Sequence, residues 1–132
     1  MRIILPILIT MMTSCAISET KTEKRDYFLA RITFYTDDPR YGKKTSSGVI
    51  AKQGTTVAAA KSVPYGTEYE IPRLKQWINT DGNFVVHDRG SALCRRTASK
   101  GKYPVLDIYV SSAKMVKKLG GRSQNIFKVY RK

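Results

Sequence analysis

The chain has 132 residues, room for one domain, and it carries 24 Lys and Arg residues against 10 Asp and Glu residues. The resulting formal charge of +14 predicts attraction to polyanions, although part of it is a solvated basic surface. A single His and two Cys exclude a zinc site built from several such ligands. We therefore expect no metal, and no motif in the chain calls for an organic cofactor.

The amino-terminal segment, residues 1–15, has the order of a secretory signal. Arg2 gives a basic start, residues 3–12 are mostly apolar, and small residues follow. The apolar run is shorter than the roughly 20 residues that span a bilayer. The segment also ends like a bacterial lipobox with Cys15 as the lipidated residue, so a lipoprotein and a plain secreted protein both stay open. Either form leaves Cys94 without a partner, which argues against a disulfide framework and predicts a buried thiol.

If the protein is exported, its positive charge can attract only polyanions that lie outside the cytoplasm. Outside the cytoplasm these are peptidoglycan with its peptide carboxylates, teichoic acids and anionic lipids. We therefore expect a periplasmic or cell-envelope location, with or without a lipid anchor, and no nucleic-acid partner. Residues 16–26 are polar with almost no apolar content and predict a flexible linker. The rest of the chain, residues 27–132, forms the expected domain, which we expect to be a monomer.

The signals in this domain are mainly those of short strands. Runs rich in β-branched and aromatic residues predict strands at 28–35, 55–59, 67–71, 84–87, 105–110 and 125–130. Turn residues separate these runs, and the pair Asp81-Gly82 is typical of a hairpin.

One helix is expected between the last two strands. Ser111 or Ser112 can cap it, and Gly120-Gly121 ends it. Its predicted buried face consists of Ala113, Val116 and Leu119. Many short strands with turns between them and one short helix predict an all-β fold, a small closed barrel.

Asp107 lies in an otherwise apolar strand, where burying an unpaired charge is energetically costly. Alternation puts Leu106 and Ile108 on the core face and places Asp107 between Val105 and Tyr109 on the other face. Such a setting raises a carboxyl pKa by desolvation, which suits a general acid near neutral pH. The alternative is a structural aspartate that accepts backbone hydrogen bonds at a barrel crossing.

Asp88 lies at a strand end, just before Arg89 and Gly90. Polar residues next to loops on a rigid scaffold are often functional, but this carboxylate could equally pin its own turn. His87 is the single histidine, and alternation turns it away from Asp88. With no second ligand in sight, we interpret His87 as structural.

Other catalytic patterns are missing from the sequence. It has no Gly-rich phosphate loop, no Ser nucleophile elbow and no Cys–His nucleophile pair, which argues against nucleophilic acyl chemistry. Aromatic residues are plentiful, and rings beside carboxylates in a groove suit sugars. Most of these rings are nevertheless expected to pack in the core or at a rim.

Four blocks in order resemble a known family. They are Tyr35 with Thr45-Ser46-Ser47-Gly48, then residues 54–67 with their Thr-Val-Ala and Pro-Tyr-Gly-Thr segments, then His87-Asp88-Arg89-Gly90, and then Leu106-Asp107-Ile108-Tyr109. The chain resembles the 3D domain, named for three aspartates and found in lytic murein transglycosylases of the MltA type and in cell-wall-associated proteins. It is also similar to rare lipoprotein A (RlpA) and expansin-like double-psi β-barrels. The resemblance covers residues 32–130 and implies a six-stranded double-psi β-barrel.

The resemblance also implies an activity on peptidoglycan glycan strands. Asp107 falls on the family's catalytic acid and Asp88 on its partner aspartate. The implied reaction cleaves the β-1,4 bond between N-acetylmuramic acid and N-acetylglucosamine and leaves a 1,6-anhydro sugar. One positioned acid suffices for it, in contrast to the paired carboxylates of ordinary glycosidases. The matching blocks contribute the candidate substrate-binding residues Tyr35, Lys61, Thr67, Arg89, Gly90 and Tyr109.

The sequence also departs from the family. The first of the three aspartates should fall near Ala59-Ala60, and neither it nor the histidine of the RlpA-like chains is there. The connection from Asp88 to Asp107 is longer than in the family. Two alternatives to the enzyme therefore stay open. One is a non-catalytic, expansin-like module that binds glycan strands, and the other is a basic polyanion binder whose two aspartates are structural.

Overall fold

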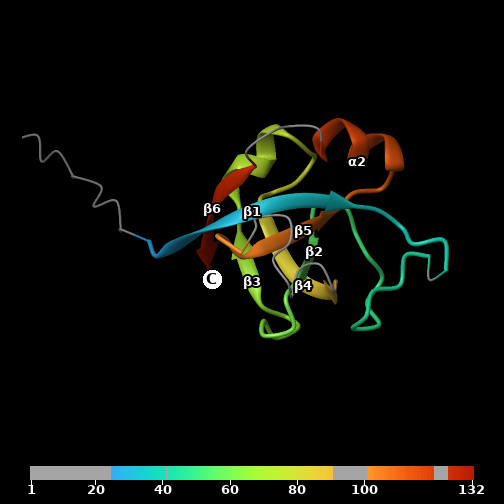
Figure 1. Cartoon of the computed structure of the whole chain (residues 1–132), viewed down its shortest axis with the longest axis horizontal. Helices are drawn as coiled ribbons and strands as arrows, with labels where there is room; N and C mark the ends of the chain where they lie inside the picture. Colours follow the sequence, from blue (N-terminus) through green and yellow to red (C-terminus); the bar gives the residue numbers. More distant parts are fainter. Residues whose placement is uncertain (1–24, 41, 91–100, 121–124) are drawn as a thin grey trace, which may run out of the picture.

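Six strands close into a barrel in the spatial order β1-β5-β2-β4-β3-β6 (Figure 1). The computed structural model describes residues 25–40, 42–90, 101–120 and 125–132. The strands are β1 (Tyr27–Tyr35), β2 (Thr56–Ala59), β3 (Glu68–Glu70), β4 (Asn83–Arg89), β5 (Val105–Tyr109) and β6 (Ile126–Arg131). The all-β prediction with one short α-helix is confirmed, and each predicted strand lies within two residues of its observed bounds.

Residues 1–24 and 91–100 lie outside the described part of the chain. The leader, the lipidation of Cys15 and most of the linker therefore stay predictions, and so does the burial of Cys94. The described chain begins at Arg25, next to the start of β1.

The barrel combines parallel and antiparallel pairing. β1 pairs with β5 and β2 pairs with β4 in parallel, whereas the β1–β6, β2–β5, β3–β4 and β3–β6 pairs are antiparallel. This mixture requires long crossover connections between parallel neighbours. It is compatible with a double-psi barrel.

The core fills the inside of the barrel. Alternate strand positions point inward, and the fully buried side chains include Ile32, Val57, Phe84, Val86 and Ile108. Burial of such residues is the main contribution to the stability of a domain of this size. The opposite face of each strand is then free to carry other chemistry.

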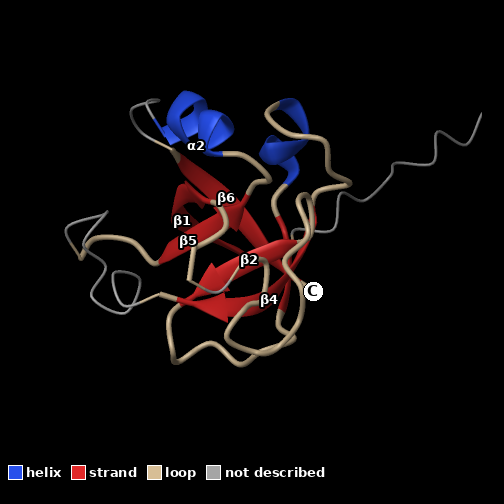
Figure 2. Cartoon of the chain, turned by 90° about the vertical axis from the view of Figure 1, so that its right-hand side faces the viewer, coloured by secondary structure: helices blue, strands red, loops and turns tan. Residues whose placement is uncertain are grey.

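Two short helices cover one end of the barrel (Figure 2). The 3-10 helix η1 (Pro72–Gln76) was not predicted; it follows β3 and buries Leu74 in the core. β3 and β4 do pair antiparallel, but Asp81-Gly82 does not form the tight hairpin that the sequence suggested, because η1 lies in the connection. Gly82 adopts a φ of 86°, which favours glycine.

The α-helix α2 (Ala113–Gly120) follows β5. Ser112 caps it, since its Oγ accepts a hydrogen bond from the backbone N–H of Met115 at 3.2 Å. Leu119 is buried, and Met115 and Val116 pack partly against the core. Ala113 is exposed, so its predicted place on the buried face was wrong. Met115 packs against the core in its place. No helix within the described ranges has the length and apolar character needed to cross a bilayer.

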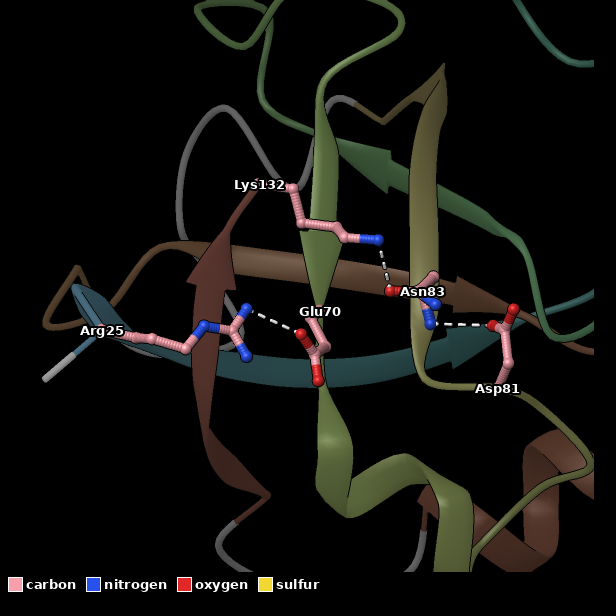
Figure 3. Close-up of polar contacts among 5 residues, drawn as sticks. All are labelled: Arg25, Glu70, Asp81, Asn83 and Lys132. Atoms are coloured by element: carbon pink, nitrogen blue, oxygen red, sulfur yellow. Dashed lines mark hydrogen bonds and ion pairs between the residues drawn. The ribbon is translucent and has the colours of Figure 1, made fainter. Parts of the chain in front are cut away.

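Exposed polar contacts join the two ends of the described chain to β3 and β4 (Figure 3). Arg25 donates to Glu70 at 2.6 Å, and Lys132 donates to the side chain of Asn83 at 2.8 Å. The backbone N–H of Asn83 in turn donates to Asp81 at 2.9 Å. Exposed pairs of this kind contribute about 1 kcal/mol or less each, so they serve to position the chain ends.

Candidate functional site

A pocket of about 640 Å³ lies on the outer face of the barrel. Its walls come from the end of β1, the loop that follows it, β2, β4 and β5. The volume is typical of small-molecule and oligosaccharide sites. The site residues predicted from sequence that line it are Tyr35, Asp88, Arg89, Gly90, Asp107 and Tyr109. Lys61 and Thr67 are not among its lining residues; Lys61 is exposed, and Thr67 donates to Pro64 O in its own turn.

The strand register places the two candidate aspartates in one row across the barrel wall. Thr33 of β1 pairs with Asp107 of β5, and Asp107 pairs with Ala58 of β2. Ala58 pairs on its other side with Asp88 of β4. The two carboxylate-bearing positions are thus separated by one strand, and the residue between them is an alanine. A small side chain there leaves room for a ligand between the two acids.

A bulge in β4 turns Asp88 toward this row. Phe84 and Val86 point into the core, so strict alternation would send Asp88 inward as well. The register shifts by one residue between the pairs Val57–Val86 and Ala58–Asp88. The extra residue is His87, as in a β-bulge, which often re-aims a side chain next to a site. Asp88 therefore faces the pocket.

The bulge also accounts for the direction of the His87 side chain. The sequence predicted that His87 would point away from Asp88, but its Nδ1 lies 3.1 Å from Oγ1 of Thr56. Thr56 shares the outer face of β2 with Ala58, so His87 and Asp88 lean to the same side of the wall. Burial lowers the pKa of His87. The ring does not line the pocket.

Asp107 is a partly buried carboxyl in a largely apolar setting. Val105, which is 3% exposed, and Ala58 form a small apolar cluster beside it with Tyr35 packed against them. The hydroxyl of Thr33 donates to Asp107 Oδ1 at 2.9 Å. Burial raises the pKa of Asp107 to about 6, with a further increase from the charge of Asp88 and an opposing effect of the Thr33 hydrogen bond.

Both faces of β5 are covered, which the sequence did not indicate. Tyr109 is 2% exposed and lies beside the loop that follows β1. Its hydroxyl donates to Asp37 of that loop at 2.5 Å. Burial, and then the hydrogen bond to Asp37, raise the pKa of Tyr109 to about 12, so it remains a donor. Asp37 itself lines the pocket and was missed, because its partner lies 72 positions away in sequence.

Asp88 is held by three donors from three segments. Tyr35 donates its hydroxyl to Oδ2 at 2.9 Å, while the backbone N–H groups of Ser46 and Arg89 donate to Oδ1 at 3.0 and 2.9 Å. Burial and the nearby charge of Asp88 raise the pKa of Tyr35 well above its usual range, so Tyr35 stays protonated. Asp88 is thereby fixed as an acceptor, whereas Asp107 accepts a side-chain hydrogen bond from Thr33 alone among the described residues.

A second set of contacts joins the two loops at the pocket rim. Ser46 and Tyr65 have their hydroxyl oxygens 2.8 Å apart, and the guanidinium of Arg89 lies 3.9 Å from the centre of the Tyr65 ring. Tyr65 is 45% exposed, so one aromatic ring stands at the rim next to the acids. Rings in such places suit sugar faces.

No known family model matches this chain, and no curated protein matches it. Within the described ranges no group of His, Cys, Asp and Glu is arranged to hold a metal ion, although four aspartates line the pocket. The groups that line the site can take part in acid–base and hydrogen-bonding chemistry. Asp107 has a pKa of about 6, and Asp88 is an acceptor held in place on β4, with β2 between the two.

Proposed function

We propose that the protein is an exported cell-wall protein that acts on peptidoglycan glycan strands as a small lytic transglycosylase. The observation that carries the proposal is the partly buried Asp107 in a pocket, with a pKa of about 6 and with Asp88 fixed across β2 from it. An acid with a pKa near the working pH can both give and take a proton in one cycle. The resemblance to the 3D and RlpA-like domains supports the proposal, including its double-psi topology.

The proposed reaction begins with protonated Asp107. It gives its proton to the glycosidic oxygen between N-acetylmuramic acid and N-acetylglucosamine, and the C1–O bond breaks with the electron pair leaving on that oxygen. The Asp107 carboxylate then takes the proton from the muramyl 6-hydroxyl while that oxygen bonds to C1. The products are a 1,6-anhydro end and a free 4-hydroxyl, and Asp107 is protonated again. Water is not consumed.

Asp88 and Tyr35 support this step without exchanging protons in it. The negative charge of Asp88 favours the protonated form of Asp107 and stabilises positive charge that develops at C1. Tyr35 holds Asp88 in place through its hydroxyl. The small Ala58 between the two acids leaves space for the sugar ring.

A non-catalytic, expansin-like binding module is the second candidate. The position of the family's first aspartate is taken here by alanine, and Ala59 is fully buried in the core. A pocket with one acid fewer can hold a glycan strand without cleaving it. A polyanion binder that uses only the basic surface is the remaining alternative.

Purified sacculi distinguish the three functions. The wild-type chain should release anhydro-muropeptides, detected by mass, and Asp107→Asn should abolish the release while leaving sacculus binding intact. The matched control is Asp81→Asn. Asp81 is exposed and lies just before the start of β4, whereas Asp88 lies near the end of that strand. Binding without any release would favour the binding module. If moderate salt abolishes the binding, and if unrelated polyanions bind equally well, the third function, a polyanion binder with a basic surface, would be favoured.

A further inference from the structure

The rim and the floor of the pocket carry opposite charges. Asp37, Asp88 and Asp107 lie among its lining residues, and so do Lys43, Lys44 and Arg89. Asp37 and Asp88 already accept hydrogen bonds from protein groups, Tyr109 in one case and Tyr35, Ser46 and Arg89 backbone in the other. The cations therefore are not used to neutralise these acids. A ligand that suits the pocket would have a neutral reacting part and an anionic group beside it.

Arg89 is arranged to receive such an anion. Its guanidinium lies over the Tyr65 ring at 3.9 Å, and within the described ranges it donates one hydrogen bond, a long one of 3.4 Å to the carbonyl oxygen of Asp88. Among the described residues, no carboxylate forms an ion pair with it. Stacking on a ring fixes the plane of the guanidinium, so less freedom is lost when its N–H groups bind a carboxylate.

Lys43 and Lys44 extend this cationic rim on the loop after β1. The loop backbone is held by bonds from Ala51 N to Lys43 O at 2.7 Å and from Thr45 N to Val49 O at 3.0 Å, and Lys44 bridges to Ile50. Asp38, the nearest acid on this loop, is paired with Arg40. In the described part of the chain neither lysine forms an ion pair.

We infer that Arg89, Lys43 and Lys44 form a carboxylate-binding subsite, so that the pocket takes carboxylate-bearing muramyl strands in preference to neutral amino-sugar strands. This inference rests on the proposed function for the identity of the strand. The sugar backbone itself is neutral. In a strand that bears peptide the lactyl carboxyl is tied up in an amide bond, so the carboxylates belong to the peptide stem, whereas a strand without peptide carries a free lactyl carboxylate. The rim would hold one of these while Asp107 faces the glycosidic oxygen.

The test compares three forms of the same muramyl oligosaccharides at about 0.15 M salt, where distant charges are screened. These are native strands, strands whose carboxylates have been converted to amides, and strands stripped of peptide by an amidase. We expect amidation to weaken binding about tenfold, as one charged hydrogen-bonded contact predicts. Stripped strands that bind like native ones would show that the subsite also accepts the lactyl carboxylate that the amidase sets free, and stripped strands that bind like amidated ones would assign the contact to the carboxylates of the peptide stem.

Substitutions of the three cationic residues test whether the preference for carboxylates arises at the pocket rim. Arg89→Gln and the double variant Lys43→Gln/Lys44→Gln should each bring the native-to-amidated ratio toward one. Arg89→Lys, which keeps the charge but loses the fork, should give an intermediate ratio. Lys117→Gln/Lys118→Gln removes the same charge from the exposed side of α2 and should leave the ratio unchanged. Thermal unfolding checks that each variant is folded.

Two results would overturn the inference. One is equal binding of native and amidated strands by the wild-type chain, and the other is an equal loss of preference in the α2 control. Release of anhydro-muropeptides is scored separately. Cleavage with no preference for carboxylates overturns this subsite and leaves the proposed function in place. Preference without cleavage supports the subsite and overturns the proposed catalysis.

Discussion

Tyr35 and Asp88 are 53 positions apart in the chain, yet the tyrosine hydroxyl donates a 2.9 Å hydrogen bond to Oδ2 of the aspartate. The contact connects the last residue of β1 to the bulged end of β4, two strands that are not neighbours in the barrel. It therefore spans the pocket and fixes Asp88 relative to Asp107.

Tyr35→Phe should slow anhydro-muropeptide release by roughly 10- to 100-fold, since a hydrogen bond to a charged group contributes about 1.5–3 kcal/mol. The ring remains and keeps its edge-on contact with Tyr109 at 5.6 Å, so the fold should be preserved. Initial rates on sacculi and thermal unfolding measure the two effects. Tyr130→Phe, on the outer surface of β6, is the control. An unchanged rate in Tyr35→Phe would show that the bond does not position the site.

The pH dependence of the rate should report Asp107. Its pKa is about 6, and the acid must start protonated, so kcat/KM should fall tenfold per pH unit above that value. Asp88→Asn removes the charge that helps to raise this pKa, so the alkaline limb should move to lower pH. The measurement is a pH–rate profile of both proteins. A limb that stays in place in Asp88→Asn would show that the two acids are not coupled.

Asp107 should also make the fold less stable at neutral pH. Its pKa rises from 3.8 to about 6 on folding, so the folded state holds a proton that the unfolded chain has lost between these values. Stability therefore decreases as pH rises from about 4 to about 6, by up to about 3 kcal/mol. Asp107→Asn does not titrate and keeps an oxygen acceptor for Thr33. Urea unfolding at pH 4 and pH 7.5 should show a smaller decrease for the variant, and parallel pH curves would contradict this.

Substitution of Gly54 tests how closely the segment before β2 packs against the backbone of Asn79. The φ of Gly54 is +85°, and an added Cβ would lie 2.6 Å from the carbonyl oxygen of Asn79. Gly48 has a φ of +90° with nothing within 4 Å, so it isolates the backbone effect. We expect Gly48→Ala to cost about 1 kcal/mol and Gly54→Ala at least about 2 kcal/mol more, since the clash involves backbone. Urea midpoints compare the two, and equal losses would contradict the close contact.

The six strands could be predicted because each has an apolar period or run that turn residues interrupt. η1 could not, since a single buried Leu74 between polar neighbours has no periodic signal. Asp88 and Asp107 were identified as candidates by their apolar settings, but their shared row depends on the register of two strand pairs, β2–β5 and β2–β4. Local sequence does not encode that register, and it does not reveal the bulge at His87.

The sequence analysis missed one pocket residue and misplaced two others, and these errors have the same physical origin. Asp37 lines the pocket and accepts a hydrogen bond from Tyr109 of β5, whereas its own neighbours in sequence have the pattern of an ordinary loop. Lys61 and Thr67 matched a family segment, yet their turn lies outside the pocket lining. Sequence patterns report the faces of single strands well, whereas a site between strands depends on how the barrel closes.

The direction of β1 has a consequence for a protein held by its amino-terminal end. β1 starts beside Arg25, which is bonded to Glu70, and ends at Tyr35 in the pocket wall, roughly 26 Å further along the strand (Figure 1). The point where the described chain enters the barrel and the pocket therefore lie at opposite ends of β1. If the leading segment holds the protein at a surface, the length of this strand adds to the reach of the linker, and the pocket meets material that much further from that surface.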